Sequence, residues 1–369
     1  MQIKKSVYSG LLAAAVLAMV PHTASAWSPK LEVSDSTWVQ LGYLHQFWYE
    51  SVDEGAADGS RSNDFFTRRN RIMLLGQATD DVFFFVNYDA AAGGASGTRQ
   101  DPVLTDAFID YRISPAFNVM VGRQLVPFSI DNQASAVSLT AIDYPTRALA
   151  PLPTNPSGAF WRDDGIQIRG VLDEGFFAYR AGYFRGAIDG ANTREDGRFT
   201  GMVMVNLASP QGGWFFNTNS LGALDVLSFG VGFDQMGRSD QDDHKAVSLF
   251  GAAEKTLGVG HLSVTAAWFD WQGVGDPTND FYDGGNTAHV TAAFLPTGSK
   301  WQPVIRWQSQ TPDDDGRTLD TFGLGLAYYI SGHRANIKAE YSINDNFENP
   351  GARTGERIDA FRVGAQLFF

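Results

Sequence analysis

The sequence of 369 residues contains no cysteine, so no disulfide bond can hold the fold together. Apart from one short stretch near the N-terminus, no apolar run approaches the roughly 20 residues of a membrane-spanning helix. Lysine is scarce, and none occurs between Lys30 and Lys245. With 28 basic and 41 acidic residues, the formal net charge is −13, which argues against nucleic acid as a partner. What remains is a chain rich in glycine and aromatic residues, which suits strands and turns.

The first 26 residues have the layout of a secretory signal peptide. Two lysines precede the apolar run Leu11–Val20, and small residues at Ala24 and Ala26 mark a cleavage site before Trp27. We therefore expect a mature, exported chain of residues 27–369. Removing two lysines and no acids leaves 26 bases and 41 acids, so its formal charge is 26 − 41 = −15.

The last twelve residues, 358–369, alternate between apolar and polar side chains and end on an aromatic residue. Because successive side chains of a strand point to opposite faces, this segment has one apolar face and one polar face. Sixteen segments of this kind follow one another along the chain, each near the length of a membrane-crossing strand. They are residues 37–49, 65–78, 81–89, 103–112, 117–124, 163–172, 176–185, 198–207, 225–235, 245–255, 260–270, 287–294, 301–308, 320–329, 334–342 and 358–369. The sequence predicts an all-β fold: a transmembrane antiparallel β-barrel of about sixteen strands, closed by pairing of the last strand with the first.

The connections alternate between tight turns and long acidic loops, as in outer-membrane barrels. The long loops are residues 50–64, 90–102, 186–197, 236–244, 271–286, 309–319 and 343–357. Residues 208–224 are long where a short turn is expected, so Trp214, Phe215 and Phe216 would form an aromatic cluster at the membrane interface or belong to a misregistered strand. Other aromatic residues near strand ends are expected to form interfacial girdles, with core packing as the alternative. They include Trp48, Phe65, Phe66, Trp268 and Trp271.

The longest connection, residues 125–162, is less charged and more apolar than the others. Its apolar side chains would be better buried inside the barrel than left in water, which predicts a constriction loop folded into the lumen. Its charged residues Asp131, Asp143 and Arg147 are then candidates for the narrowest part of the channel. The alternative is a loop that contacts a neighbouring subunit.

If the apolar face of each strand meets lipid, the opposite face lines the lumen. The bases expected there are Arg69, Arg71, Arg112, Arg169, Arg180, Arg306, Lys338 and Arg362. The acids expected there are Asp89, Asp106, Asp110, Glu254 and Glu340. Eight bases against five acids predict a wall that favours phosphate-like or carboxylate solutes, because guanidinium binds both in bidentate fashion. The alternative is that Arg and Asp on adjacent strands pair, stiffen the wall and select nothing.

Three blocks of sequence carry a family resemblance: Phe65–Arg71, Thr105–Tyr111 and Val121–Phe128. They are similar to the phosphate-selective porin family (porin O/P type) of Gram-negative outer membranes. The likeness is strongest over residues 65–186 and compatible with the whole mature chain, and it implies a sixteen-stranded trimeric barrel whose third loop forms the eyelet. The best-known members carry lysines at the eyelet, whereas Arg123 and Arg147 are the only bases between residues 113 and 161 here. The resemblance therefore implies the scaffold and leaves selectivity for phosphate itself open.

Catalytic signals are weak. The six histidines are scattered without metal-ligand spacing, and no Gly-x-Ser-x-Gly motif occurs. Asp313–Asp315 lacks the glycine and glutamate that follow in a calcium loop. We therefore expect no enzyme activity, no metal and no cofactor.

The sequence thus predicts an outer-membrane porin of a Gram-negative bacterium. It would form a water-filled channel for passive diffusion of small hydrophilic solutes, with a preference for anions. Expected partners are outer-membrane lipid and lipopolysaccharide, further copies in a homotrimer, and the barrel-assembly machinery, which would recognise the C-terminal strand. The alternatives are a structural or conduit barrel that sheathes a partner protein, and a barrel enzyme.

Overall fold

The computed structural model describes residues 30–56, 58–90, 102–153, 161–186, 197–237, 243–273, 284–313, 318–345 and 357–369. The predicted signal peptide and parts of the predicted long loops lie outside the described residues. Among the described residues, no helix has the length and apolar character needed to cross a membrane.

Strands make up nearly all of the regular structure. They are β1 (Leu31–Ser34), β2 (Thr37–Val52), β3 (Ser62–Thr79), β4 (Val82–Asp89), β5 (Val103–Ser114), β6 (Phe117–Leu125), β7 (Arg162–Leu172), β8 (Phe177–Phe184), β9 (Arg198–Asn206), β10 (Val226–Met236), β11 (His244–Leu257), β12 (Gly260–Gln272), β13 (Gly284–Pro296), β14 (Trp301–Pro312), β15 (Leu319–Ser331), β16 (Ala335–Asp345) and β17 (Ile358–Phe368). One short 3₁₀ turn, Asp173–Gly175, joins β7 to β8.

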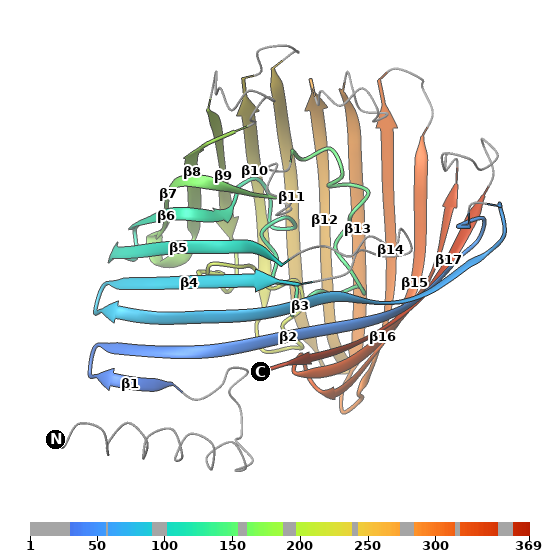
Figure 1. The fold of residues 1–369 in the computed structure, drawn as a ribbon, viewed down its shortest axis with the longest axis horizontal. Helices are drawn as coiled ribbons and strands as arrows, with labels where there is room; N and C mark the ends of the chain where they lie inside the picture. The colour runs from blue at the N-terminus through green and yellow to red at the C-terminus, as the bar shows by residue number, and fades with distance from the viewer. Residues whose placement is uncertain are drawn as a thin grey trace.

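Strands β2 to β17 form a closed antiparallel barrel (Figure 1). Each strand pairs with the next along the chain, and β17 pairs with β2 from Ala360 opposite Val52 to Phe368 opposite Leu44. Beyond that ladder, the amide of Tyr43 donates to the carbonyl of Phe369 at 2.8 Å. The predicted sixteen-stranded barrel and its closure are therefore confirmed, because each of the strands β2 to β17 is paired on both sides. The short β1, which pairs with the start of β2, was not predicted.

Burial alternates along each strand, as the pleat requires. On β10, Val226, Ser228 and Asp234 are buried, whereas Leu227 and Phe229 are 37% and 55% exposed. The same pattern leaves large apolar side chains exposed around the whole outer wall. An apolar surface this extensive is stable in hydrocarbon and not in water, so the outer wall fits a membrane.

The aromatic residues near strand ends divide between the two faces of the wall. Phe65 and Trp268 are exposed on the outer face, as interfacial girdles require, at 67% and 40%. Trp48, Phe66 and Trp271 are at most 6% exposed and point inward. The predicted girdle is therefore wrong for these three residues, because adjacent positions on a strand face opposite sides.

Residues 126–153, here termed the lumen loop, run through the interior between the wall of β2–β5 and the wall of β11–β15 (Figure 1). Hydrogen bonds from inward side chains on distant strands hold it. Ser248 Oγ on β11 donates to the carbonyl of Phe128 at 2.6 Å, and Thr287 Oγ1 on β13 donates to that of Ala148 at 2.6 Å. Lys338 Nζ on β16 donates to the carbonyl of Ala141 at 3.0 Å. The loop thus crosses the lumen instead of lying on the outer surface.

Residues 208–224, here termed the turn segment, also fold into the lumen, from the opposite end. The amide of Phe216 donates to the carbonyl of Gln133 at 3.0 Å, and that of Ser135 donates to the Phe216 carbonyl at 2.8 Å. Phe216 is only 2% exposed. Both sequence interpretations of this segment were wrong: it is neither an interfacial cluster nor a misregistered strand. Phe216 is buried against the lumen loop, whereas Trp214 and Phe215 are half-buried and pack against Phe85 of the barrel wall.

Candidate functional site

Among the described residues, three cavities lie at successive depths inside the barrel. A cavity of about 190 Å³ lies near the loop end and is lined by Glu50 and Arg362, which lie near strand ends. A middle cavity of about 260 Å³ is lined by Arg71, halfway along β3. A cavity of about 690 Å³ opens at the turn end beside Ser114 and Pro115. The lumen loop lines the first two, and the turn segment lines the last two.

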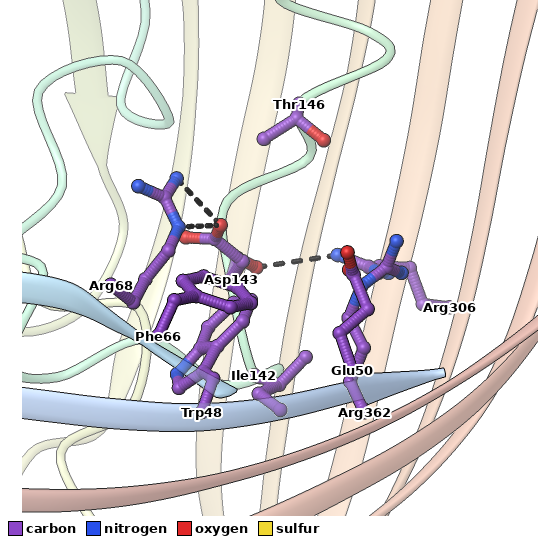
Figure 2. A pocket seen from close by; sticks show the side chains of 9 residues that line it. All are labelled: Trp48, Glu50, Phe66, Arg68, Ile142, Asp143, Thr146, Arg306 and Arg362. Atoms are coloured by element: carbon purple, nitrogen blue, oxygen red, sulfur yellow. Dashed lines mark hydrogen bonds and ion pairs between the residues drawn. The ribbon is translucent and has the colours of Figure 1, made fainter. Parts of the chain in front are cut away.

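The loop-end cavity contains charged and apolar groups (Figure 2). Arg68 and Arg69 both bind the Asp143 carboxylate of the lumen loop, at 2.8 and 2.6 Å. On the opposite side, Arg362 of β17 binds Glu50 of β2, its direct cross-strand partner. An ion pair on each side of the loop-end cavity therefore faces the same cavity.

The remaining base of this cavity, Arg306, fixes the lumen loop. It donates to the carbonyls of Asp143 and Tyr144, at 3.3 and 3.1 Å, and pairs with Glu340 on β16. Its side chain is 5% exposed. Arg306 therefore acts as an anchor for the loop backbone more than as a contact for solute.

In the middle cavity, each arginine is backed by an aspartate. Arg71 Nε donates to Asp89 Oδ2 at 2.7 Å, and Arg162 Nε to Asp106 Oδ1 at 3.2 Å. Both arginines line the cavity, whereas Asp106 is fully buried behind Arg162. The pair therefore presents its positive partner to the cavity.

At the turn end, Arg112 and Arg169 share the carboxylate of Asp110, at 2.9 and 2.7 Å. Asp110 is fully buried, while the Arg112 side chain is 40% exposed. Arg169 and Arg180 also donate to the carbonyl of Gly213, at 2.9 and 2.8 Å, and so hold the turn segment. These arginines line the cavity and position one of its walls.

The other residues proposed from the sequence belong to the lumen loop, or contact it or the turn segment. Glu254 on β11 accepts hydrogen bonds from the amide and the hydroxyl of Ser220 in the turn segment. Arg147 Nε donates to Thr321 Oγ1 at 2.8 Å, and its amide donates to Gln308 at 3.0 Å. Asp131 lies 3.1 Å from His289 on β13, with both side chains buried. Lys338 binds loop carbonyls, as described above. Many of the bases are thus ion-paired, and a selectivity role for each of them stays a prediction.

Several inward charges were missed by the sequence analysis. Arg68 lies at a register shift between β2 and β3, where Gln46 faces Arg69 and the next residue, Phe47, faces Thr67. A β-bulge of this kind puts one extra residue out of alternation, so strict parity could not place Arg68. Arg198 on β9 and Asp234 on β10 do follow the alternation, and they pair at 2.5 Å. A complete application of the parity rule would have found that pair.

Arg123 lies on the outer face of β6, the face that also carries the exposed Val121. Its guanidinium binds Asp164 of β7 through Nε at 2.9 Å and Nη2 at 2.8 Å. The pair is only partly buried. Pairing two charges on the outer face lowers the cost of placing either one near lipid.

The carboxylate of Asp143 stays ionised over a wide pH range. Burial alone would raise its pKa, but Arg68 and Arg69 outweigh burial and hold the pKa well below its usual range. The stabilisation is complete above the ordinary carboxyl pKa of about 3.9 and is lost only as pH falls through the lowered folded value. The lumen loop should therefore remain docked at neutral and mildly acidic pH.

Gly232 on β10 allows the base of the lumen loop to approach the wall. A Cβ at Gly232 would lie 1.9 Å from the carbonyl oxygen of Phe128. We expect Gly232→Ala to displace Phe128, at a cost of about 1–3 kcal/mol from overpacking, and to change single-channel conductance. Gly258→Ala is the matched control, because a Cβ there meets nothing within 4 Å. Equal conductance and thermal stability for the two variants would contradict this role of Gly232.

Within the described ranges, no group of three or more His, Asp or Glu side chains is placed to hold a metal ion. The arrangement is instead suited to contact with dissolved anions, since guanidinium groups line each cavity.

Comparison with solved structures shows the same fold in outer-membrane channels. The anion-selective porin from Comamonas acidovorans superposes with a TM-score of 0.63 at 16% identity, over 90% of this chain and 100% of that chain. The outer-membrane channel DcaP of Acinetobacter baumannii superposes with a TM-score of 0.58 at 13% identity, over 92% of this chain and 99% of that chain. The trimer form of OmpT from Vibrio cholerae superposes with a TM-score of 0.54 at 14% identity, over 91% of this chain and 100% of that chain.

No curated protein matches the sequence. The model of the family described as phosphate-selective porin O and P matches residues 39–209, a range that includes the three sequence blocks named above. The resemblance seen in the sequence is thus confirmed: residues 39–209 match the phosphate-selective porin O and P family, in a chain that folds as a sixteen-stranded porin barrel.

Proposed function

We propose that this protein is an outer-membrane porin through which small hydrophilic solutes diffuse passively, with a preference for anions. One observation carries the proposal: a barrel with an apolar outer wall contains cavities lined by more arginine than carboxylate. Three arginines and two carboxylates line the loop-end cavity. Two arginines and no carboxylate line the middle cavity. Three arginines and one carboxylate line the turn-end cavity.

The ion pairs do not cancel this bias. Asp106 and Asp110, which pair with lining arginines, are fully buried and do not line the cavities themselves. A solute therefore meets the guanidinium first, and the carboxylate lies behind it. The electrostatic interaction with a solute is stronger for the nearby guanidinium than for the more distant, buried carboxylate. The lumen should therefore attract anions.

Transport by such a channel needs no conformational cycle. Guanidinium groups at three depths offer successive weak binding positions, and a solute moves between them down its gradient. We propose that the lumen loop narrows this path, because its backbone crosses the interior and is held by Arg306 and Lys338. Asp143 and Arg147 would then lie beside the narrowest part.

The family and the fold indicate a channel rather than an enzyme. We further propose a homotrimer, in keeping with the trimer form of the structurally similar OmpT. Outer-membrane lipid and lipopolysaccharide would surround it. The C-terminal strand ending in Phe369 would be recognised by the barrel-assembly machinery.

The proposal is tested by inserting purified protein into planar lipid bilayers. We expect discrete conductance steps and, across a potassium chloride gradient, a reversal potential of the sign given by an anion-preferring channel. Membranes that stay silent although the barrel is folded would overturn the channel. A reversal potential of the opposite sign would overturn only the anion preference.

A further inference from the structure

The loop-end cavity has a continuous apolar wall, in addition to its charged groups (Figure 2). Trp48, Phe66 and Ile142 form a separate cluster, each 5–6% exposed. The rings of Trp48 and Phe66 lie 5.8 Å apart at 60°. Strands β2 and β3 and the lumen loop each contribute one member, so the wall is complete only when the loop is docked.

An apolar wall gives no stabilisation to inorganic phosphate or chloride, whose hydration is disturbed beside it. A solute with an apolar body gains free energy there in proportion to the area it buries. Flat rings gain more, because they can also stack against an indole or phenyl face. The wall therefore favours a solute that carries an aromatic ring.

Two cationic groups of the cavity are within reach of a solute: Arg68, whose guanidinium lies 5.5 Å from the centre of the Trp48 ring, and Arg362 on the opposite side. The side chains of Arg68 and Arg362 are 30% and 26% exposed. Asp143 takes hydrogen bonds from Nε and Nη2 of Arg68, and Glu50 takes one from Nε of Arg362. Because each guanidinium carries five N–H donors, each can also bind a solute carboxylate.

The net charge of the side chains that line the cavity matches a solute with one negative charge. Three arginines and two carboxylates line the cavity, which gives 3 − 2 = +1. A monocarboxylate neutralises that excess, whereas a doubly charged phosphate would leave one uncompensated charge near the apolar wall.

The size of the cavity limits the solute further. Its volume of about 190 Å³ is below the roughly 300–1,000 Å³ of pockets that take drug-sized ligands. A single ring with a carboxylate fits these limits, and a chain of sugars or of phosphates does not.

We propose that this cavity is a binding site for small aromatic monocarboxylates, with the ring on Trp48, Phe66 and Ile142 and the carboxylate between Arg68 and Arg362. The inference rests on the proposed function, since it names the solute class that the channel would take up. A solute held here would be concentrated at the entrance to the narrow path.

Binding can be measured by titrating the detergent-solubilised protein with benzoate, acetate and inorganic phosphate in a calorimeter. We expect benzoate to bind roughly tenfold more tightly than acetate or phosphate, a factor that corresponds to about 1.4 kcal/mol. Equal affinities for the three anions would overturn the proposal. Because this readout does not depend on conduction, it also separates the site from the channel function, which the bilayer measurement tests.

Variants identify the two halves of the site. Trp48→Ala should remove the advantage of benzoate over acetate, and Arg362→Gln should weaken both several-fold. Ile142→Ser, in the lumen loop, supplies a second test of the apolar wall if Trp48→Ala does not fold. Trp268→Ala is the control, because Trp268 lies on the outer face. The proposal is overturned if benzoate binding is unchanged in folded Ile142→Ser and Arg362→Gln proteins.

Discussion

Replacing residues 128–159 with a short glycine–serine connection is expected to raise the single-channel conductance several-fold. The amide of Val126 donates to the carbonyl of Trp161 at 3.0 Å, so the two ends of the loop are adjacent and a short turn can join them. The barrel ladders do not depend on the loop, because β6 pairs with β5 and β7 along its length. Wall side chains that now bind loop carbonyls, such as Ser248 and Lys338, would be solvated by water instead.

The conductance of this deletion variant has to be compared with that of a variant shortened in a loop outside the lumen. Trimming residues 58–60, which are exposed between β2 and β3, should leave conductance unchanged. Circular dichroism and electrophoretic mobility with and without heating would establish that both variants form barrels. An unaltered conductance of the folded deletion variant would contradict the constriction role of the lumen loop.

Replacing Arg112, Arg169 and Arg180 together by Gln is expected to reverse the ion preference of the channel. These are the bases of the turn-end cavity, and their loss leaves Asp81 in the lining and Asp110 behind it. The reversal potential should move toward cation selectivity. The shift should be largest in dilute salt, because the Debye length falls from about 10 Å at 0.1 M to about 3 Å at 1 M.

Two of these arginines, Arg169 and Arg180, also hold the carbonyl of Gly213, so the triple variant loosens the turn segment as well. A charge-matched control separates the two effects. Arg169→Gln combined with Asp110→Asn removes one base and one acid, and it should change the reversal potential little. If this neutral pair shifts the potential as far as the triple variant does, the arginines act through structure and not through charge.

Much of the barrel could be predicted from the sequence because its determinants are local. Alternation of apolar and polar residues decides which face of a strand meets lipid, and the length of each segment matches the membrane. Arg362 illustrates this: its parity alone indicates an inward side chain, and the structure pairs it there with Glu50. The closing pair of β17 and β2 follows because a barrel in hydrocarbon leaves no strand edge unpaired.

The interior could not be predicted in the same way. The turn segment lies in the lumen because Phe216 and Thr218 find partners in the lumen loop, far away in the sequence. Arg68 reaches Asp143 only because a bulge shifts its strand by one residue. Such placements depend on which surfaces meet after the barrel has closed.

The sequence by itself therefore determined the sixteen barrel strands, their inner and outer faces, and an arginine-rich inner wall. The sequence also predicted that residues 125–162 enter the lumen. Only the tertiary structure decided that the turn segment enters from the opposite end and that the two connections divide the interior into cavities. It also decided which carboxylates lie behind the arginines instead of beside them. The physical reason is that strand patterning depends on neighbours two residues away, whereas the lumen is built from long-range contacts that no local period records.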